Sequence, residues 1–171
     1  MPINYPDMLL ASMANRLKLY FINQNQPDIL KNILMVGIHT GGVWVAQHLH
    51  ALLELSQPLG ELNIAFYRDD FSRIGLHPHV KPSHLPFDIN ERHIILVDDV
   101  LYTGRTIRAA LNELFDYGRP ASVTLAVLVE RNGRELPIQP EVIGCSLCLE
   151  TGKHLKLCGP EPLHLEIRAT T

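Results

Sequence analysis

Two adjacent carboxylates, Asp98 and Asp99, follow the apolar run of residues 94–97, and a short loop and a helical pattern come directly after them. Carboxylates accept hydrogen bonds, so a pair of them can bind neighbouring sugar hydroxyls. Backbone N–H groups at the start of a helix bind a phosphate, and the helix dipole strengthens that binding. The segment therefore has the groups needed to hold both ends of a sugar phosphate.

The loop between the acids and the helix adds donors to this candidate site. Thr103 and Thr106 carry hydroxyl groups, and Gly104 lets the backbone approach a ligand closely. Two alternatives need no ligand: the two acids can form a solvated turn, or Asp99 can cap its own loop. We predict a phosphate site because strand, double acid, Thr-Gly loop and helix start occur in this order.

A second candidate anion site is the loop His39-Thr40-Gly41-Gly42, between the apolar run of residues 33–38 and the helical pattern of residues 43–53. Its N–H groups can form an anion-binding nest, although a tight turn is the more common meaning of a pair of glycines. Ligands of open parallel sheets bind beyond the carboxyl ends of the strands. We therefore expect this loop and the Asp98 loop to face one crevice.

Apolar runs alternate with helical patterns through the middle of the chain, which predicts an α/β fold with a parallel sheet flanked by helices. The expected strands are residues 33–38, 62–67, 94–97 and 123–129, and the expected helices are residues 9–21 (capped by Asp7), 43–53 and 107–114. From Val142 on, we predict short β segments. Residues 69–90 contain three prolines and little periodicity, so we expect a long functional or mobile loop there.

Size and composition indicate a single globular domain over residues 1–171. Hydrophobic residues make up 46% of the chain, which argues against disorder. No apolar stretch reaches the ~18 residues of a membrane span, and no signal-peptide pattern is visible, so we expect a cytoplasmic protein without membrane contact. The net charge of −3 and the lack of a Lys/Arg cluster argue against strong non-specific binding of nucleic acid.

Cys145, Cys148 and Cys158 are predicted to be reduced thiols, because their number is odd and no export signal is visible. Their spacing, with His154 nearby, is compatible with zinc. In a regular strand, however, Cys145 and Cys148 would point to opposite faces. We therefore interpret the cysteines as small apolar strand residues and predict no definite metal site.

Residues 97–106, Val-Asp-Asp-Val-Leu-Tyr-Thr-Gly-Arg-Thr, resemble the phosphoribosyl-pyrophosphate motif of the type I phosphoribosyltransferases. The variant found here looks most like the pyrimidine operon attenuator/uracil phosphoribosyltransferase family, with similarity over about residues 8–143. The resemblance implies a type I phosphoribosyltransferase fold, with a flexible hood at about residues 67–90 and a β-rich C-terminal part. It also implies transfer of phosphoribosyl from 5-phosphoribosyl 1-pyrophosphate (PRPP) to uracil, giving UMP and pyrophosphate.

The candidate site residues follow from the motif and the resemblance. Asp98 and Asp99 are the expected catalytic pair, which holds the ribose hydroxyls and faces the cation that develops on the sugar. Ribose and 5-phosphate are further assigned to Leu101, Tyr102, Thr103, Gly104, Arg105 and Thr106. Pyrophosphate is assigned to His39, Thr40, Gly41 and Gly42, with Arg68 and Arg73 as candidate cations, and the base to Val129, Glu130 and Arg131.

Two departures from the family pattern bear on these assignments. The family loop Lys-Thr-Arg-Gly is His39-Thr40-Gly41-Gly42 here, so two permanent cations are absent. Either backbone N–H groups and Mg²⁺ carried by the diphosphate compensate, or the rate is low, or a cation comes from elsewhere. The family stretch Asp-Arg-Gly-His-Arg-Glu is Glu130-Arg131-Asn132-Gly133-Arg134-Glu135, without the histidine.

Two other functions stay open at this point. One is a non-catalytic, RNA-binding attenuation regulator that senses uridine nucleotides, and the other is a phosphoribosyltransferase for another base. Readers of single-stranded RNA combine basic and stacking residues, and the sequence shows no such cluster. We therefore expect PRPP and uracil as partners, a homo-oligomer, and at most weak binding to a messenger RNA leader.

Overall fold

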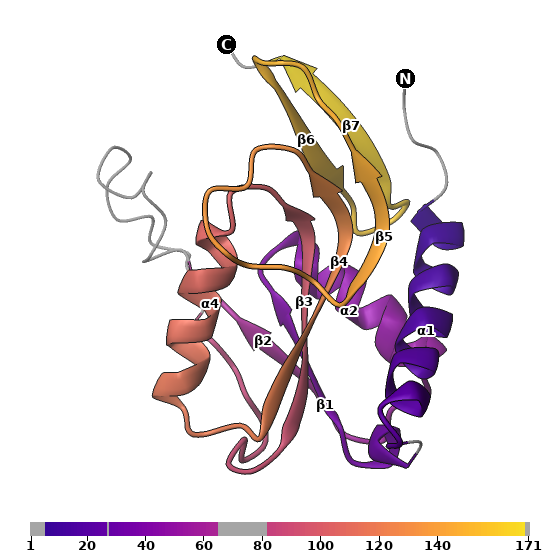
Figure 1. The fold of residues 1–171 in the computed structure, drawn as a ribbon, viewed down its shortest axis with the longest axis vertical. Helices are drawn as coiled ribbons and strands as arrows, with labels where there is room; N and C mark the ends of the chain where they lie inside the picture. The colour runs from indigo at the N-terminus through magenta and orange to yellow at the C-terminus, as the bar shows by residue number, and fades with distance from the viewer. Residues whose placement is uncertain (1–5, 27, 65–81, 170–171) are drawn as a thin grey trace.

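The computed structural model describes residues 6–26, 28–64 and 82–169, and its centre is a five-stranded parallel sheet (Figure 1). In the order in which they pair, the strands are β2 (Leu59–Leu62), β1 (Leu34–Ile38), β3 (His93–Leu101), β4 (Ser122–Arg131) and β5 (Val142–Leu147). The helices are α1 (Pro6–Asn23), the short 3₁₀ turn η1 (Ile29–Lys31), α2 (Gly41–Leu52) and α4 (Arg105–Asp116). Within the described ranges, no helix has both the length and the apolar character needed to cross a membrane.

The sheet is buried on both faces, as the apolar runs predict. In β3, Ile95 and Val97 face the core under α1 and α2, whereas Ile94 and Leu96 face the core under α4. This alternation follows from the two-residue period of a strand. Figure 1 shows α1 and α2 on one side of the sheet and α4 on the other. The predicted α/β fold with a parallel sheet between helices is therefore confirmed.

The C-terminal part is rich in β structure, also as expected. β6 (Lys153–Cys158) and β7 (His164–Ala169) form a separate antiparallel hairpin. Its buried side chains, Leu155, Leu157 and Leu165, belong to the same core as α1 and α2. The hairpin is thus anchored to the body of the domain through apolar packing.

Two element boundaries near the expected site differ from the prediction. The strand expected to end at Val97 continues to Leu101, because β4 is long enough to pair with it through Val129 and Glu130. Both aspartates therefore lie in the strand and not in the loop. Helix α2 begins at Gly41, so both glycines of the expected loop form its first turn.

The expected hood lies partly outside the described residues, and its flexibility stays a prediction. The described end of that range packs against the body of the domain. His84 exchanges two backbone hydrogen bonds with Glu61, and Ser83 donates a hydrogen bond of 2.9 Å to Glu113 on α4. Ile89 is fully buried.

The packing of α4 can be tested with two neighbouring residues of that helix. Leu114 is fully buried, whereas 53% of the surface of Phe115 is exposed. We expect Leu114→Ala to lower the free energy of unfolding by about 2–5 kcal/mol, because it leaves a cavity in the core. Phe115→Ala should change it by only about 0.5 kcal/mol. Urea denaturation measures both, and equal losses would contradict the assigned face of the helix.

Candidate active site

The double acid lies at the carboxyl end of β3, in the middle of the sheet. Asp98 is buried, with 4% of its surface exposed, and Asp99 is half-buried. Asp98 Oδ1 accepts a hydrogen bond of 3.0 Å from the backbone N–H of Asp99, which orients its carboxylate. The two acids are therefore held by a paired strand, and Asp99 is the more accessible of the two.

The first turn of α2 lies directly against these acids. A Cβ atom placed on Gly41 would come within 2.2 Å of Asp99 Oδ2, and one placed on Gly42 within 2.7 Å of the Val97 carbonyl oxygen. Position 42 has no room for a side chain because it faces backbone atoms, whereas a side chain at position 41 would require the Asp99 carboxylate to move. The structure thus brings together the two segments that were expected to face one crevice.

The His39 side chain is directed toward β2 and not toward the acids. Its Nε2 lies 2.7 Å from Glu61 Oε2, and its backbone N–H donates to the Leu62 carbonyl. The ring that replaces the family's lysine is therefore already paired with a carboxylate. Thr40 is exposed, just before α2. The other two candidate cations, Arg68 and Arg73, lie outside the described residues.

On the other side of the acids, the chain turns into α4 through the expected phosphate loop. Gly104 adopts φ +95°, a left-handed conformation that residues with a side chain rarely adopt. Thr103 Oγ1 accepts a hydrogen bond of 3.2 Å from the Arg105 N–H. α4 starts at Arg105, so its N-terminus and its positive dipole end lie where the phosphate is expected.

Arg134 holds this loop in place, and the sequence did not reveal that role. Its Nε donates to the Tyr102 carbonyl at 2.9 Å, its Nη1 to the Ile138 carbonyl, and its Nη2 to Glu130 Oε1 at 2.7 Å. Beside it, the backbone N–H groups of Glu135 and Leu136 both donate to the Thr103 carbonyl. The only signal in the sequence was that Arg134 and Glu135 match the last two residues of the family stretch at residues 130–135.

Of the three residues assigned to the base, two line a cavity. Val129 is fully buried in β4, inside the core. Glu130 and Arg131, at the end of β4, line a cavity of about 270 Å³. The complete lining consists of Glu130, Arg131, Asn132, Gly133, Arg134, Ser146 and Leu147.

Arg131 has an unusual environment for a charged residue. It is buried, and its Nη1 donates to the Lys153 carbonyl at 3.0 Å. Its guanidinium lies 4.0 Å from the centre of the Tyr102 ring, a cation–π contact. Its Nε is fully buried and has no hydrogen-bond partner.

The Tyr102 ring also explains why position 133 is a glycine in this chain. Gly133, which stands where the family stretch has histidine, adopts φ +109°. A Cβ atom there would come within 2.4 Å of Tyr102 Cε2. The ring therefore occupies the space that a side chain at position 133 would need.

The three cysteines are free thiols, as predicted. Cys145 is half-buried in β5, and burial raises the pKa of its thiol. Cys148 is exposed just after β5, and Cys158 ends β6. Within the described part of the chain, Cys145, Cys148 and His154 do not gather into a possible metal site.

Comparison with known proteins agrees with this geometry. Residues 7–160 match the phosphoribosyl transferase domain. The chain is 68% identical over 165 residues to the Bifunctional protein PyrR of Nitrosococcus oceani, covering 95% of this chain and 90% of that protein. A protein with the same name from Pseudomonas paraeruginosa is 54% identical over 166 residues, with coverage of 97% and 95%.

Solved structures show the same fold at low sequence identity. A hypoxanthine-guanine-xanthine phosphoribosyltransferase superposes with a TM-score of 0.59 at 20% identity, covering 84% of this chain and 76% of that chain. A purine phosphoribosyltransferase from Pyrococcus horikoshii gives a TM-score of 0.59 at 22% identity, with coverage of 84% and 86%. Together with the domain match and the identity to the PyrR proteins, these findings confirm the family expected from the motif at residues 97–106: the chain is a type I phosphoribosyltransferase and belongs to the PyrR family.

Proposed function

We propose that this chain transfers the phosphoribosyl group from PRPP to uracil, giving UMP and pyrophosphate. One observation carries the proposal: the Asp98–Asp99 pair lies in contact with the first turn of α2 and leads, through residues 102–104, into the first turn of α4. A double acid between two helix N-termini suits a ribose that has a phosphate group at each end. The acids match the hydroxyls, and the N-termini match the two phosphate groups.

The transfer breaks the bond between the anomeric carbon and the pyrophosphate oxygen, and a ring nitrogen of uracil forms the new bond. Positive charge develops on the ribose, and negative charge develops on the leaving group. The carboxylates of Asp98 and Asp99 stabilise the first charge, and the N-terminus of α2 stabilises the second. Because these groups are fixed in the fold, little reorganisation is needed during the reaction.

The acids also fit the magnesium ion that we expect the diphosphate to carry. Mg²⁺ prefers hard oxygen ligands, and the side chains next to the start of α2 are the carboxylates of Asp98 and Asp99. The nearby imidazole of His39 is paired with Glu61 instead. When bound, the ion supplies positive charge against the diphosphate. The loop of residues 39–42 itself provides positive charge only through its backbone dipoles.

The proposed site for the base is the cavity of about 270 Å³ that Glu130 and Arg131 line. A pyrimidine needs few polar contacts, and Asn132 and Ser146 in the same lining carry groups that can donate and accept hydrogen bonds. The choice of uracil as the base is supported by membership of the PyrR family.

The acids are tested by substitution with the isosteric amide. We expect Asp98→Asn and Asp99→Asn each to lower kcat/KM for PRPP by a factor of about 10² or more, because a fixed charge facing the transition state is lost. Asp116→Asn, at the exposed end of α4, is the matched control and should retain activity. Measured UMP formation at the wild-type rate in both site variants would refute the assignment.

Arg134 is proposed as a positioning residue for the phosphate loop. We expect Arg134→Lys to raise KM for PRPP about tenfold with a smaller change in kcat, since a lysine cannot bridge Tyr102, Ile138 and Glu130 at once. Arg92→Lys is the control. Arg92 lies just before β3, at the end of that strand away from the acids, and its guanidinium donates to the Asn32 carbonyl. A fall in kcat with KM unchanged would contradict a role in holding the loop.

A second candidate function is control of pyrimidine genes through a messenger RNA leader. It is favoured by the name of the relatives, which are called bifunctional. Within the described residues, Arg134 makes three hydrogen bonds and Arg131 is buried beside the Tyr102 ring, so we propose that an RNA surface draws on residues from two copies of the chain. A homo-oligomer, as the resemblance implies, is therefore part of this proposal.

RNA binding is expected to be weak and dependent on nucleotide. In a gel-shift assay with a pyrimidine-gene leader, UMP should strengthen binding if it prefers the RNA-competent state. Affinity should fall only modestly between low and physiological salt, because few basic residues are available to neutralise phosphates. Binding of the leader RNA with a nanomolar Kd at physiological salt would contradict this expectation. It would show that RNA binding does not need the family's histidine at position 133.

A further inference from the structure

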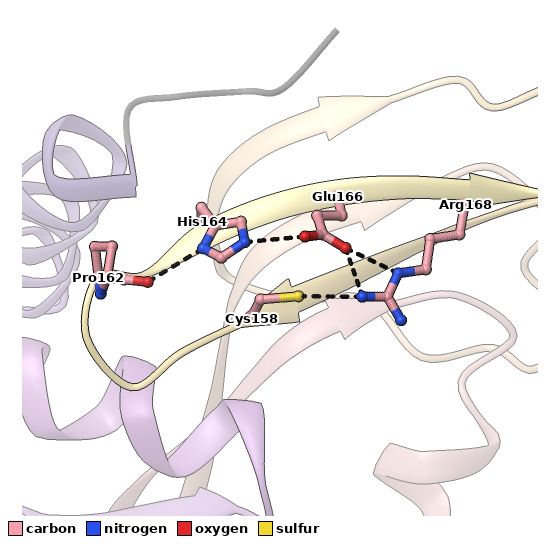
Figure 2. A network of polar contacts seen from close by, with 5 residues as sticks. All are labelled: Cys158, Pro162, His164, Glu166 and Arg168. Carbon is pink, nitrogen blue, oxygen red and sulfur yellow. Dashed lines mark hydrogen bonds and ion pairs between the residues drawn. The ribbon is translucent and has the colours of Figure 1, made fainter.

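The C-terminal hairpin carries a cluster of three possible metal ligands that the active site does not use. Cys158 at the end of β6 lies opposite His164 at the start of β7, and Glu166 follows on the same face of β7 (Figure 2). The Cys158 sulfur, an imidazole nitrogen of His164 and a carboxylate oxygen of Glu166 all lie within 4.8 Å of one another. All three residues are half-buried.

The His164 ring is oriented as it is in metal sites. Its Nδ1 lies 3.2 Å from the Pro162 carbonyl oxygen, and its Nε2 lies 3.0 Å from Glu166 Oε1. A carbonyl oxygen can only accept, so Nδ1 carries a proton. Nε2 then needs a cation between itself and the carboxylate, either a proton or a metal ion. Ligating histidines commonly donate their second N–H to a backbone carbonyl, as His164 does.

The carboxylate of Glu166 is held in place from the other side. Arg168 Nε donates to Glu166 Oε2 at 2.9 Å, which leaves Oε1 facing His164. The Arg168 guanidinium and the His164 ring therefore hold the Glu166 carboxylate between them in one orientation. Arg168 Nη2 also lies 3.8 Å from the Cys158 sulfur, as Figure 2 shows. One arginine therefore orients two of the three ligands.

We propose that Cys158, His164 and Glu166 form a binding site for Zn²⁺ or a similar divalent transition-metal ion. The ion binds the Cys158 sulfur, His164 Nε2 and Glu166 Oε1, and water completes the tetrahedron. Zinc–ligand bonds of about 2.0–2.3 Å place tetrahedral ligands roughly 3.3–3.6 Å apart. His164 Nε2 and Glu166 Oε1 lie 3.0 Å apart, and all three ligand atoms lie within 4.8 Å of one another, so a bound ion requires the side chains to adjust to this spacing. Thiolate and imidazole ligands select such a metal over Mg²⁺ or Ca²⁺.

Metal binding at this position would tie the hairpin together near its turn. A two-stranded hairpin is marginally stable by itself, and this one connects to the body through the turn beside Trp44 of α2. The ion replaces the proton between His164 and Glu166, and the thiol of Cys158 loses its proton to become a ligand. The site shares no residue with the proposed PRPP site, so it does not depend on the proposed function.

Titration of the full chain with Co²⁺ under reducing conditions tests the site. We expect one equivalent to bind, with the visible bands of a tetrahedral site and a sulfur-to-cobalt charge-transfer band. Zn²⁺ should displace Co²⁺ and raise Tm. Cys158→Ser should abolish the charge-transfer band and weaken Zn²⁺ binding at least tenfold, whereas Cys148→Ser, at an exposed thiol outside the cluster, should change neither.

Two further measurements complete the test. Glu166→Gln should weaken Zn²⁺ binding but retain the charge-transfer band, because the sulfur ligand remains. UMP formation by Cys158→Ser should match the wild type, which separates this site from the proposed catalytic function. The proposal is overturned if wild-type protein binds Co²⁺ without a charge-transfer band, or if the band is lost in Cys148→Ser and kept in Cys158→Ser.

Discussion

The close approach of α2 to the end of β3 is the constraint on which the proposed site depends. Gly42 brings the backbone of the helix against the Val97 carbonyl, at a distance that no side chain allows, and Gly41 lies beside the Asp99 carboxylate. This contact places a helix N-terminus, with its partial positive charge, beside a pair of acids. The positive end of the helix opposes the negative charge of the acids and suits an anionic diphosphate.

A second set of contacts fixes the opposite wall of the site. Arg134 and the backbone of residues 135–136 bind the carbonyls of the loop between β3 and α4, and the Tyr102 ring lies over Arg131. Arg131 in turn donates to the Lys153 carbonyl, at the start of β6. The cavity proposed for the base is therefore linked to the C-terminal hairpin.

Much of this could be predicted from the sequence, because the relevant signals are local. Alternating apolar runs and helical patterns depend only on neighbours along the chain, and they were enough for the parallel sheet, its flanking helices and the β-rich end. The motif from Val97 to Thr106 was enough for the family, since strand, double acid and Thr-Gly loop are contiguous. The expected meeting of the His39 and Asp98 segments followed from a general property of parallel sheets.

The sequence by itself determined the fold class, the family and the segments that carry the site, whereas the tertiary structure decided how their side chains are engaged. The pairing of His39 with Glu61, the bond from Arg134 to the Tyr102 carbonyl and the clash between position 133 and Tyr102 each join residues that are 22 or more positions apart. The cluster of Cys158, His164 and Glu166 depends on the register between β6 and β7, which places Cys158 opposite His164. Such contacts depend on packing between elements, which no local pattern encodes.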